Sequence, residues 1–311
     1  MLSRIAESIF WLNRYAERSA VIVRHVKVNY SISLENNYLD HSYWPQLLAY
    51  YGGLNPKEIE LATKDLNRAA AFLLVDDANS FSFKENISKS RMNAKGLQDH
   101  ISKEVWEQIN FLFLTTKSIS GNKPHSKTNF QNLIETLDKN IVLYNGLIDL
   151  TIARGLSWDF LNLGRFIERT FLTIDWLDLV YQKQNYQFED NDDVVYWRTF
   201  LLMESGYEYY LKNYKNLNSN SNIIQQMILD KDFPQSIYYS ISRMKKYILK
   251  ILEKEKNMDK RMILREFEKV NAQIEYADLN HIKKQGLQNY LYNIKSELNN
   301  FSQTVHQNFF S

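Results

Sequence analysis

The residues in this chain best suited to chemistry form two copies of an Arg-x-x-Glu-Arg motif. The copies are Arg14, Glu17 and Arg18, and Arg165, Glu168 and Arg169. In a helix, positions i, i+3 and i+4 share one face, so each glutamate stands between two arginines that would otherwise repel each other. If the two helices meet, four guanidinium groups gather around two carboxylates. The remaining positive charge suits a carboxylate or a phosphate, which arginine binds in a bidentate manner.

Two interpretations of these motifs remain open. In the first, the charges form a closed salt-bridge network that fixes how parts of the chain pack, because buried ionic networks can specify an arrangement. In the second, the four arginines bind an anionic substrate, and Glu17 or Glu168 acts as the general acid or base. Trp11, Trp158 and Gly164 are the neighbouring candidates for a structural role or for the wall of a pocket.

Other catalytic and metal-binding signatures are missing from the sequence. The absence of cysteine excludes disulfides, thiolate metal sites and cysteine nucleophiles. There is no Glu-x-x-His pair of the di-iron type, no phosphate loop, no dinucleotide fingerprint and no Gly-x-Ser-x-Gly elbow. We interpret Asp278 and His281 as a surface helix pair, and Asp190, Asp192 and Asp193 as a loop that caps the next helix. We therefore expect no metal and no cofactor.

The composition of the chain limits its partners. The 38 basic and 36 acidic side chains give a net charge of +2, which argues against a dedicated nucleic-acid binder. The balance of charges also argues against a disordered chain. Hydrophobic residues make up 44% of the 311 residues, enough for a sizeable core. No window resembles a membrane span, and charges interrupt the first residues where a signal peptide needs an apolar run. These features predict a cytoplasmic protein that binds neither nucleic acid nor membrane.

Apolar residues recur at helical spacing along most of the chain, and this predicts an all-α fold. Glycine (9) and proline (4) are scarce, where average usage would give roughly 22 and 16. Asn55 and Ser157 are expected N-caps, with Pro56 at a first helical position. The expected helices cover residues 2–28, 56–75, 82–117, 130–153, 158–181 and 194–215, then roughly 223–230, 235–256, 258–276 and 280–308.

Internal self-similarity predicts two duplicated halves, about residues 1–125 and 150–311. Three landmarks recur in the same order at offsets of 151, 153 and 154 residues, and the first landmark is the charged motif itself. The other two are Tyr43-Trp44 with Tyr196-Trp197, and Asp76 and Ser82 with Asp230 and Ser236. Two homologous helical units would bury their apolar faces against each other as subunits do in an isologous dimer. We therefore expect a helical bundle with a pseudo-two-fold axis near the two motifs.

The segments 1–18 and 158–169, with Arg91-x-Asn93-Ala94 and the segment 101–110 between them, resemble the alpha-E domain family of bacterial proteins. The resemblance covers the whole chain and implies a single, mostly helical domain over residues 1–311. One position departs from the pattern. Asn13 stands where many relatives have glycine, whereas Gly164 keeps the glycine in the second motif, so a site that needs close backbone approach would be asymmetric.

The resemblance also implies a setting for the protein. Relatives tend to be encoded beside circularly permuted ATP-grasp ligases and transglutaminase-like peptidases. One hypothesis is therefore a non-catalytic accessory protein of a system that forms peptide or amide bonds, with an ATP-grasp ligase or a transglutaminase-like protein as its partner. The alternative is an enzyme of the same pathway, whose Arg/Glu site binds a carboxylate or phosphate substrate. Whether the chain is an enzyme stays open at this point.

Overall fold

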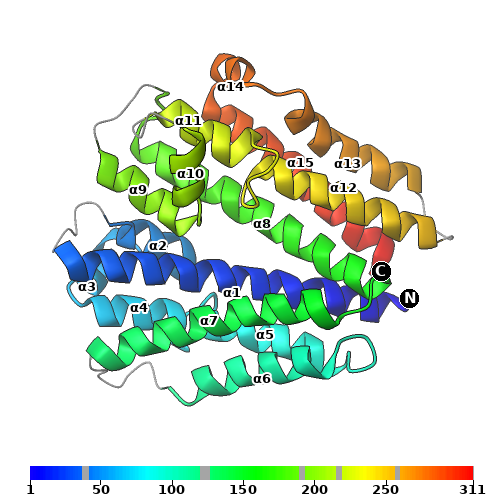
Figure 1. The fold of residues 1–311 in the computed structure, drawn as a ribbon, viewed down its shortest axis with the longest axis horizontal. Helices are drawn as coiled ribbons and strands as arrows, with labels where there is room; N and C mark the ends of the chain where they lie inside the picture. Colours follow the sequence, from blue (N-terminus) through cyan, green and yellow to red (C-terminus); the bar gives the residue numbers. More distant parts are fainter. Residues whose placement is uncertain (37–41, 120–126, 189–192, 215–218, 256–259, 311) are drawn as a thin grey trace. The chain divides into compact units, whose positions relative to one another are not determined.

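The computed structural model describes residues 1–36, 42–119, 127–188, 193–214, 219–255 and 260–310 (Figure 1). All regular structure in these ranges is helical, without a strand, which confirms the all-α prediction. Within the same ranges, no helix is long and apolar enough to cross a membrane. Contacts divide the chain into two compact units. We name Trp11–Ala153 the N-unit, and Met1–Phe10 together with Arg154–Ser311 the C-unit.

The N-unit is built on the long helix α1, whose residues from Trp11 onward belong to it. Its helices are α1 (Ser3–Asn36), α2 (Trp44–Gly52), α3 (Pro56–Thr63), α4 (Leu66–Leu74), α5 (Phe83–Lys95), α6 (Lys103–Lys117) and α7 (Lys127–Thr151). The short helices α2, α3 and α4 pack on one another, and α4 to α7 pack as successive neighbours. The Ser90 hydroxyl of α5 donates to the Leu12 carbonyl of α1 (2.9 Å). Lys27 of α1 pairs with Asp138 of α7 at 2.6 Å. Polar contacts therefore join α1 to both α5 and α7.

The C-unit is a bundle of four longer helices with shorter helices at its connections. The long helices are α8 (Leu156–Lys183), α12 (Ile237–Lys254), α13 (Lys260–Glu275) and α15 (Leu287–Phe309). The shorter elements are α9 (Val194–Met203), α10 (Tyr207–Asn213), α11 (Asn220–Ile224), the π-helical turn η1 (Gln225–Leu229) and α14 (Leu279–Gln285). Helix α8 packs on α12 and α15, and α13 packs on the same two, so the four close a ring around a core. Trp176, Ile248, Phe267 and Phe301 are buried in the unit.

The first ten residues of the chain pack within the C-unit. The Met1 amino group pairs with Glu255 at 3.1 Å, and the Phe10 ring lies 5.2 Å from that of Phe310, measured between centroids. The helix α1 therefore begins in one unit and continues into the other at Trp11.

The helices follow the same order in the two units. Each begins with a long helix (α1 or α8), continues through three short segments and two helices of intermediate length, and ends with a long helix (α7 or α15). In the C-unit one of the three short segments is α11 continued by η1, and α14 is an addition before α15. The predicted bounds of two duplicated halves, about 1–125 and 150–311, remain a prediction.

Several expected helices are divided in the structure. The helix expected over 56–75 ends at Thr63, and Asp65 caps a new one by accepting from Asn67 and Arg68 amides. Three other expected helices are interrupted near a glycine: 82–117 at Gly96, 194–215 at Gly206, and 280–308 at Gly286. Asn55 caps α3 with Pro56 in the first turn, as expected. Ser157 is not an N-cap, because α8 begins at Leu156 and Gly155 is the residue at its N-cap.

Candidate functional site

In the N-unit, the cations of the first motif lie on aromatic rings. The Arg14 guanidinium is 4.5 Å from the centroid of the Trp11 ring, which is stacked on Tyr15 at 5.4 Å. The Arg18 guanidinium lies 5.6 Å from the Tyr15 ring, and Lys89 Nζ of α5 lies 5.9 Å from it. Such cation–ring contacts stabilise by about 0.5–1 kcal/mol each at exposed sites and more when desolvated. Three positive charges are thus held by two rings.

In the C-unit, Arg169 of the second motif joins α8 to the turn before α12. Its Nη1 donates to the Pro234 carbonyl at 3.1 Å, and its guanidinium lies 5.1 Å from the Phe166 ring. Phe166 in turn stacks on Tyr247 of α12, with centroids 6.0 Å apart. The arginine and the ring beside it therefore help to hold the two helices that share the largest contact of this unit.

Arg165 belongs to a cationic environment shared by α8 and α12. Burial raises the pKa of the Tyr247 hydroxyl, while the positive charges of Arg243 and Arg165 oppose that shift. Arg243 donates to the Tyr239 hydroxyl at 2.8 Å and lies 4.7 Å from its ring. The second motif therefore combines cations with tyrosines of α12.

The two motifs make corresponding contacts in their own units. In each, the last arginine lies over the aromatic residue three positions earlier. The carbonyl two residues before the N-cap serine of α5 or α12 accepts from a cation in both cases: Ser80 from Lys89 and Pro234 from Arg169, each at 3.1 Å. In each unit, a cationic side chain thus donates a hydrogen bond to the turn that precedes α5 or α12.

The motif glutamates are buried. Glu17 and Glu168 are each 3% exposed, and none of the six motif residues lacks an interaction partner. Ionised carboxylates tolerate burial only when they are paired and hydrogen-bonded. Because the motifs lie in different units, the combined cluster of four arginines stays a prediction, as do the catalytic and anion-binding roles.

Gly164 gives space for the backbone of α1. A Cβ atom at this position would lie 2.4 Å from the Phe10 carbonyl oxygen, closer than real Cβ atoms approach any atom. The glycine therefore permits close contact between α8 and the first residues of α1 inside the C-unit. Trp158 is buried under the guanidinium of Arg154, 3.6 Å from its ring. Trp11, as described above, carries the Arg14 guanidinium.

The aspartates at 193 and 278 act as helix caps. Asp193 accepts from the Tyr196 amide and caps α9, and Asp278 accepts from the His281 amide and caps α14. Asp190 and Asp192 lie outside the described residues. In the part of the chain that the structure describes, no three histidines or carboxylates are grouped to hold a metal ion.

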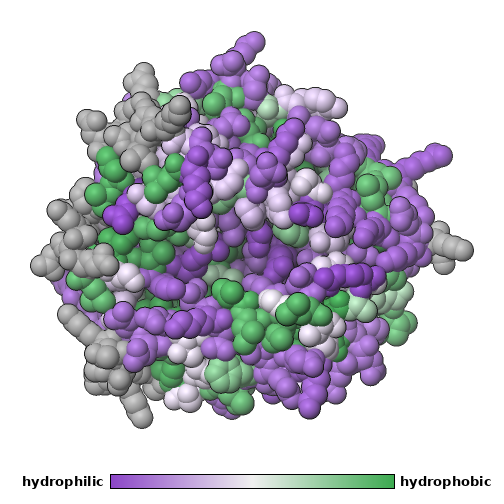
Figure 2. All heavy atoms as spheres, in the orientation of Figure 1, coloured by the Kyte–Doolittle hydropathy of each residue, from purple (hydrophilic) through white to green (hydrophobic). Residues whose placement is uncertain are grey.

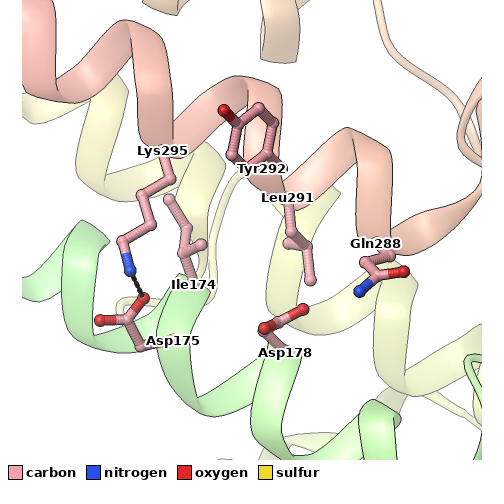
Figure 3. A pocket seen from close by; sticks show the side chains of 7 residues that line it. All are labelled: Ile174, Asp175, Asp178, Gln288, Leu291, Tyr292 and Lys295. Carbon is pink, nitrogen blue, oxygen red and sulfur yellow. Dashed lines mark ion pairs between the residues drawn. The ribbon is translucent and has the colours of Figure 1, made fainter.

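A pocket between α8 and α15 was missed by sequence reasoning. Its polar lining consists of Asp175 and Asp178 from α8, with Gln288 and Lys295 from α15 (Figure 3). The spacings i, i+3 and i, i+7 place each pair on one helix face, and this much is readable in the sequence. A sequence alone does not tell which two helix faces meet, so the four residues could not be grouped.

The fold and the motifs define a helical domain with two Glu-Arg pairs, at 17–18 and 168–169. Residues 1–310 match the Alpha-E family, described as a predicted alpha-helical domain with a conserved ER motif, so the chain belongs to the Alpha-E family. No curated protein and no solved structure matches the chain.

Proposed function

We propose that this protein is a non-catalytic accessory protein that binds an ATP-grasp-type ligase or a transglutaminase-like protein in a peptide- or amide-forming system. The observation that carries the proposal is the use of the motif side chains. The glutamates are buried, Arg14, Arg18 and Arg169 lie on aromatic rings, and Arg169 also donates to the Pro234 carbonyl in the turn before α12. These are packing roles. We therefore place the binding of the partner on the exposed surface of the helices.

An apolar face on α7 supports a binding role. Figure 2 shows a largely hydrophilic surface with several groups of hydrophobic side chains, one of them over the C-terminal half of α7. Val142, Leu143 and Leu150 are exposed there, Leu150 to 82%, and spacings of seven and eight residues place them on one helix face. Exposed apolar patches of this kind mark surfaces that protein partners cover. In this proposal the partner is the ATP-grasp-type ligase or the transglutaminase-like protein.

The order of the helices supports an origin by duplication, with a pseudo-two-fold relation between the halves. The equivalent turns before α5 and α12 add to this, because each is capped by a serine that accepts from the amide three residues later. In such a molecule the two motifs would occupy equivalent places, and their contacts would repeat as structural features.

The proposal is tested by affinity capture of the tagged protein from its own organism, with mass spectrometry of the proteins that accompany it. We expect an ATP-grasp or transglutaminase-like protein with the wild type. We expect Leu150→Ser to lose this partner, because the change removes an apolar side chain from the proposed binding face. The variant should still fold, since Leu150 is exposed. The exposed polar change Asn300→Ser on α15 should keep the partner. Recovery of the wild type alone, or of unrelated proteins only, would sink the accessory role.

The alternative is an enzyme of the same pathway, in which the arginines bind a carboxylate or phosphate and Glu17 or Glu168 transfers a proton. The buried carboxylates beside arginines favour it, since burial and nearby charge are how active sites adjust general acids and bases. Turnover of a peptide or amide substrate by the purified protein alone, abolished in folded Glu17→Gln or Glu168→Gln variants, would replace the accessory role with this one.

A further inference from the structure

The pocket between α8 and α15 has an apolar floor and polar ends. Ile174 and Leu291 are buried at its base, and the exposed Tyr292 stands at its rim (Figure 3). Its volume is about 160 Å³, below the roughly 300–1,000 Å³ of pockets for drug-sized ligands. The pocket therefore suits one group of side-chain size. All of its lining residues belong to the C-unit.

The charges that line this pocket do not cancel. Asp175 Oδ1 pairs with Lys295 Nζ at 2.5 Å, and this pair occupies one end of the pocket (Figure 3). Asp178 stands at the other end, opposite Gln288. No lysine or arginine among the described residues forms an ion pair with Asp178, so the lining carries one unbalanced negative charge.

Asp178 is oriented by a hydroxyl group from the end of its own helix. The Tyr186 hydroxyl donates to Asp178 Oδ1 at 2.9 Å. The chain reverses for this contact through Asn185 and Tyr186, which both have positive φ (50° and 55°), and the Tyr186 amide bonds back to the Tyr181 carbonyl. Burial, followed by the hydrogen bond and charge of Asp178, raises the pKa of Tyr186 to about 12, so the phenol stays a donor. A carboxylate has about four acceptor positions, and one donor leaves most of them for a ligand.

We infer that this pocket binds a primary ammonium group on an apolar stem, with Asp178 as the counter-ion. An ammonium supplies three donors and the missing positive charge. The stem lies over Ile174 and Leu291, as methylene chains do when they cover apolar surface. The chemistry is shared by free alkylamines and by the side chain of a lysine in a peptide. The site is independent of the proposed function and of the Arg-x-x-Glu-Arg motifs.

Ligand-observed NMR titration of the full chain tests the inference with three probes. The first is n-butylammonium, the second is its neutral analogue 1-butanol, and the third is Nα-acetyl-lysine N-methylamide, a model of lysine in a peptide. We expect butylammonium to bind about tenfold or more tightly than butanol, a factor that corresponds to about 1.4 kcal/mol. Tighter binding of the lysine probe assigns the pocket to peptides, and its exclusion assigns the pocket to free amines.

Three variants make the test specific. Asp178→Asn should weaken butylammonium binding about tenfold or more, because it removes the counter-ion and preserves the shape. Glu253→Gln, which removes an exposed carboxylate on α12, should leave binding unchanged. Lys295→Met should leave binding unchanged or tighter, since it removes a competing cation. The inference is overturned if butanol binds as well as butylammonium, or if Asp178→Asn and Glu253→Gln behave alike. Circular dichroism of each variant checks the fold.

Discussion

At the scale of single residues, the charged motif and the glycine beside it serve different purposes. Arg14, Arg18 and Arg169 cover aromatic rings with their flat guanidinium groups, whereas Gly164 lacks a side chain, so that two backbones can approach. The sequence identified all of these positions as candidates. It could not distinguish a glycine that lines a pocket from one that allows close packing, because that depends on Phe10, a residue 154 positions away.

Gly164→Ala should destabilise the protein by about 1–3 kcal/mol, the usual cost of forcing an extra methyl group into a packed site. Its Cβ atom meets a backbone carbonyl, which cannot move aside as a flexible side chain can. Gly146→Ala is the matched control, since Gly146 is exposed within α7 and its Cβ would meet nothing. That change should stabilise by about 0.5–1 kcal/mol. Urea unfolding measures both, and equal effects would contradict this role of Gly164.

At the scale of elements, the turn before α12 depends on one carboxylate. Asp230 Oδ1 accepts from the amides of Asp232 (2.8 Å) and Phe233 (2.9 Å), and the Tyr209 hydroxyl of α10 donates to both its oxygens at 3.0 Å. Asp76 occupies the corresponding place before α5 and accepts one amide bond, from Ala78 at 2.9 Å. We therefore expect Asp230 to contribute more to the free energy of unfolding than Asp76 does.

Asp230→Ala should lower the free energy of unfolding by about 2–4 kcal/mol, because it removes several bonds to an ionised acceptor and leaves a tyrosine hydroxyl without its partner. Asp76→Ala should cost only about 1 kcal/mol, as expected for a single bond at a partly exposed turn. Chemical denaturation followed by circular dichroism gives both values. Equal losses would show that the bonds to Tyr209 contribute little.

The same contact predicts a dependence on pH. Burial and the neighbouring Asp230 raise the pKa of Tyr209 to about 12, against an ordinary value of about 10. Below pH 10 the hydroxyl is protonated in both states, and its stabilising bond is fully present. Between pH 10 and 12 the unfolded chain loses this proton first, so stability falls as pH rises. Tyr209→Phe should therefore be more destabilising at pH 9 than at pH 11, and a penalty that is constant over this range would contradict the contact.

Element boundaries show how far the sequence leads. The long helices α1, α7 and α8 were predicted because their apolar spacing continues for many turns. The break at Lys64 was missed, since neither glycine nor proline marks it, although Asp65 is a good N-cap. The break at Gly286 was visible as a glycine but was outweighed by the flanking periodicity. The α8–α15 pocket was beyond reach, because Asp178 and Gln288 come together only through packing of the bundle.

At the scale of the whole molecule, the two units share one order of helices and some corresponding contacts, but other contacts differ. The serine caps of α5 and α12 and the ring-bound Arg18 and Arg169 are among the contacts that correspond. The helix α14, the bonds from Tyr209 to Asp230 and the α8–α15 pocket lie in the C-unit. This difference supports separate tasks for the two units, with the apolar α7 face in one and the anionic pocket in the other.

The first ten residues should be critical for the C-unit, although they begin a helix that continues into the N-unit. Phe10 is buried against Phe310, which is also 6.1 Å from Phe160. Phe10→Ala should destabilise by about 3–5 kcal/mol, the range for a large aromatic truncated in a core. Hydrogen exchange with mass spectrometry should show faster exchange in α8 and α15, with much smaller changes in α5 and α6. Phe111→Ala, at an exposed position of α6, should leave exchange in α8 and α15 unchanged. Faster exchange mainly in α5 and α6 of the Phe10 variant would mean that this residue stabilises the N-unit instead.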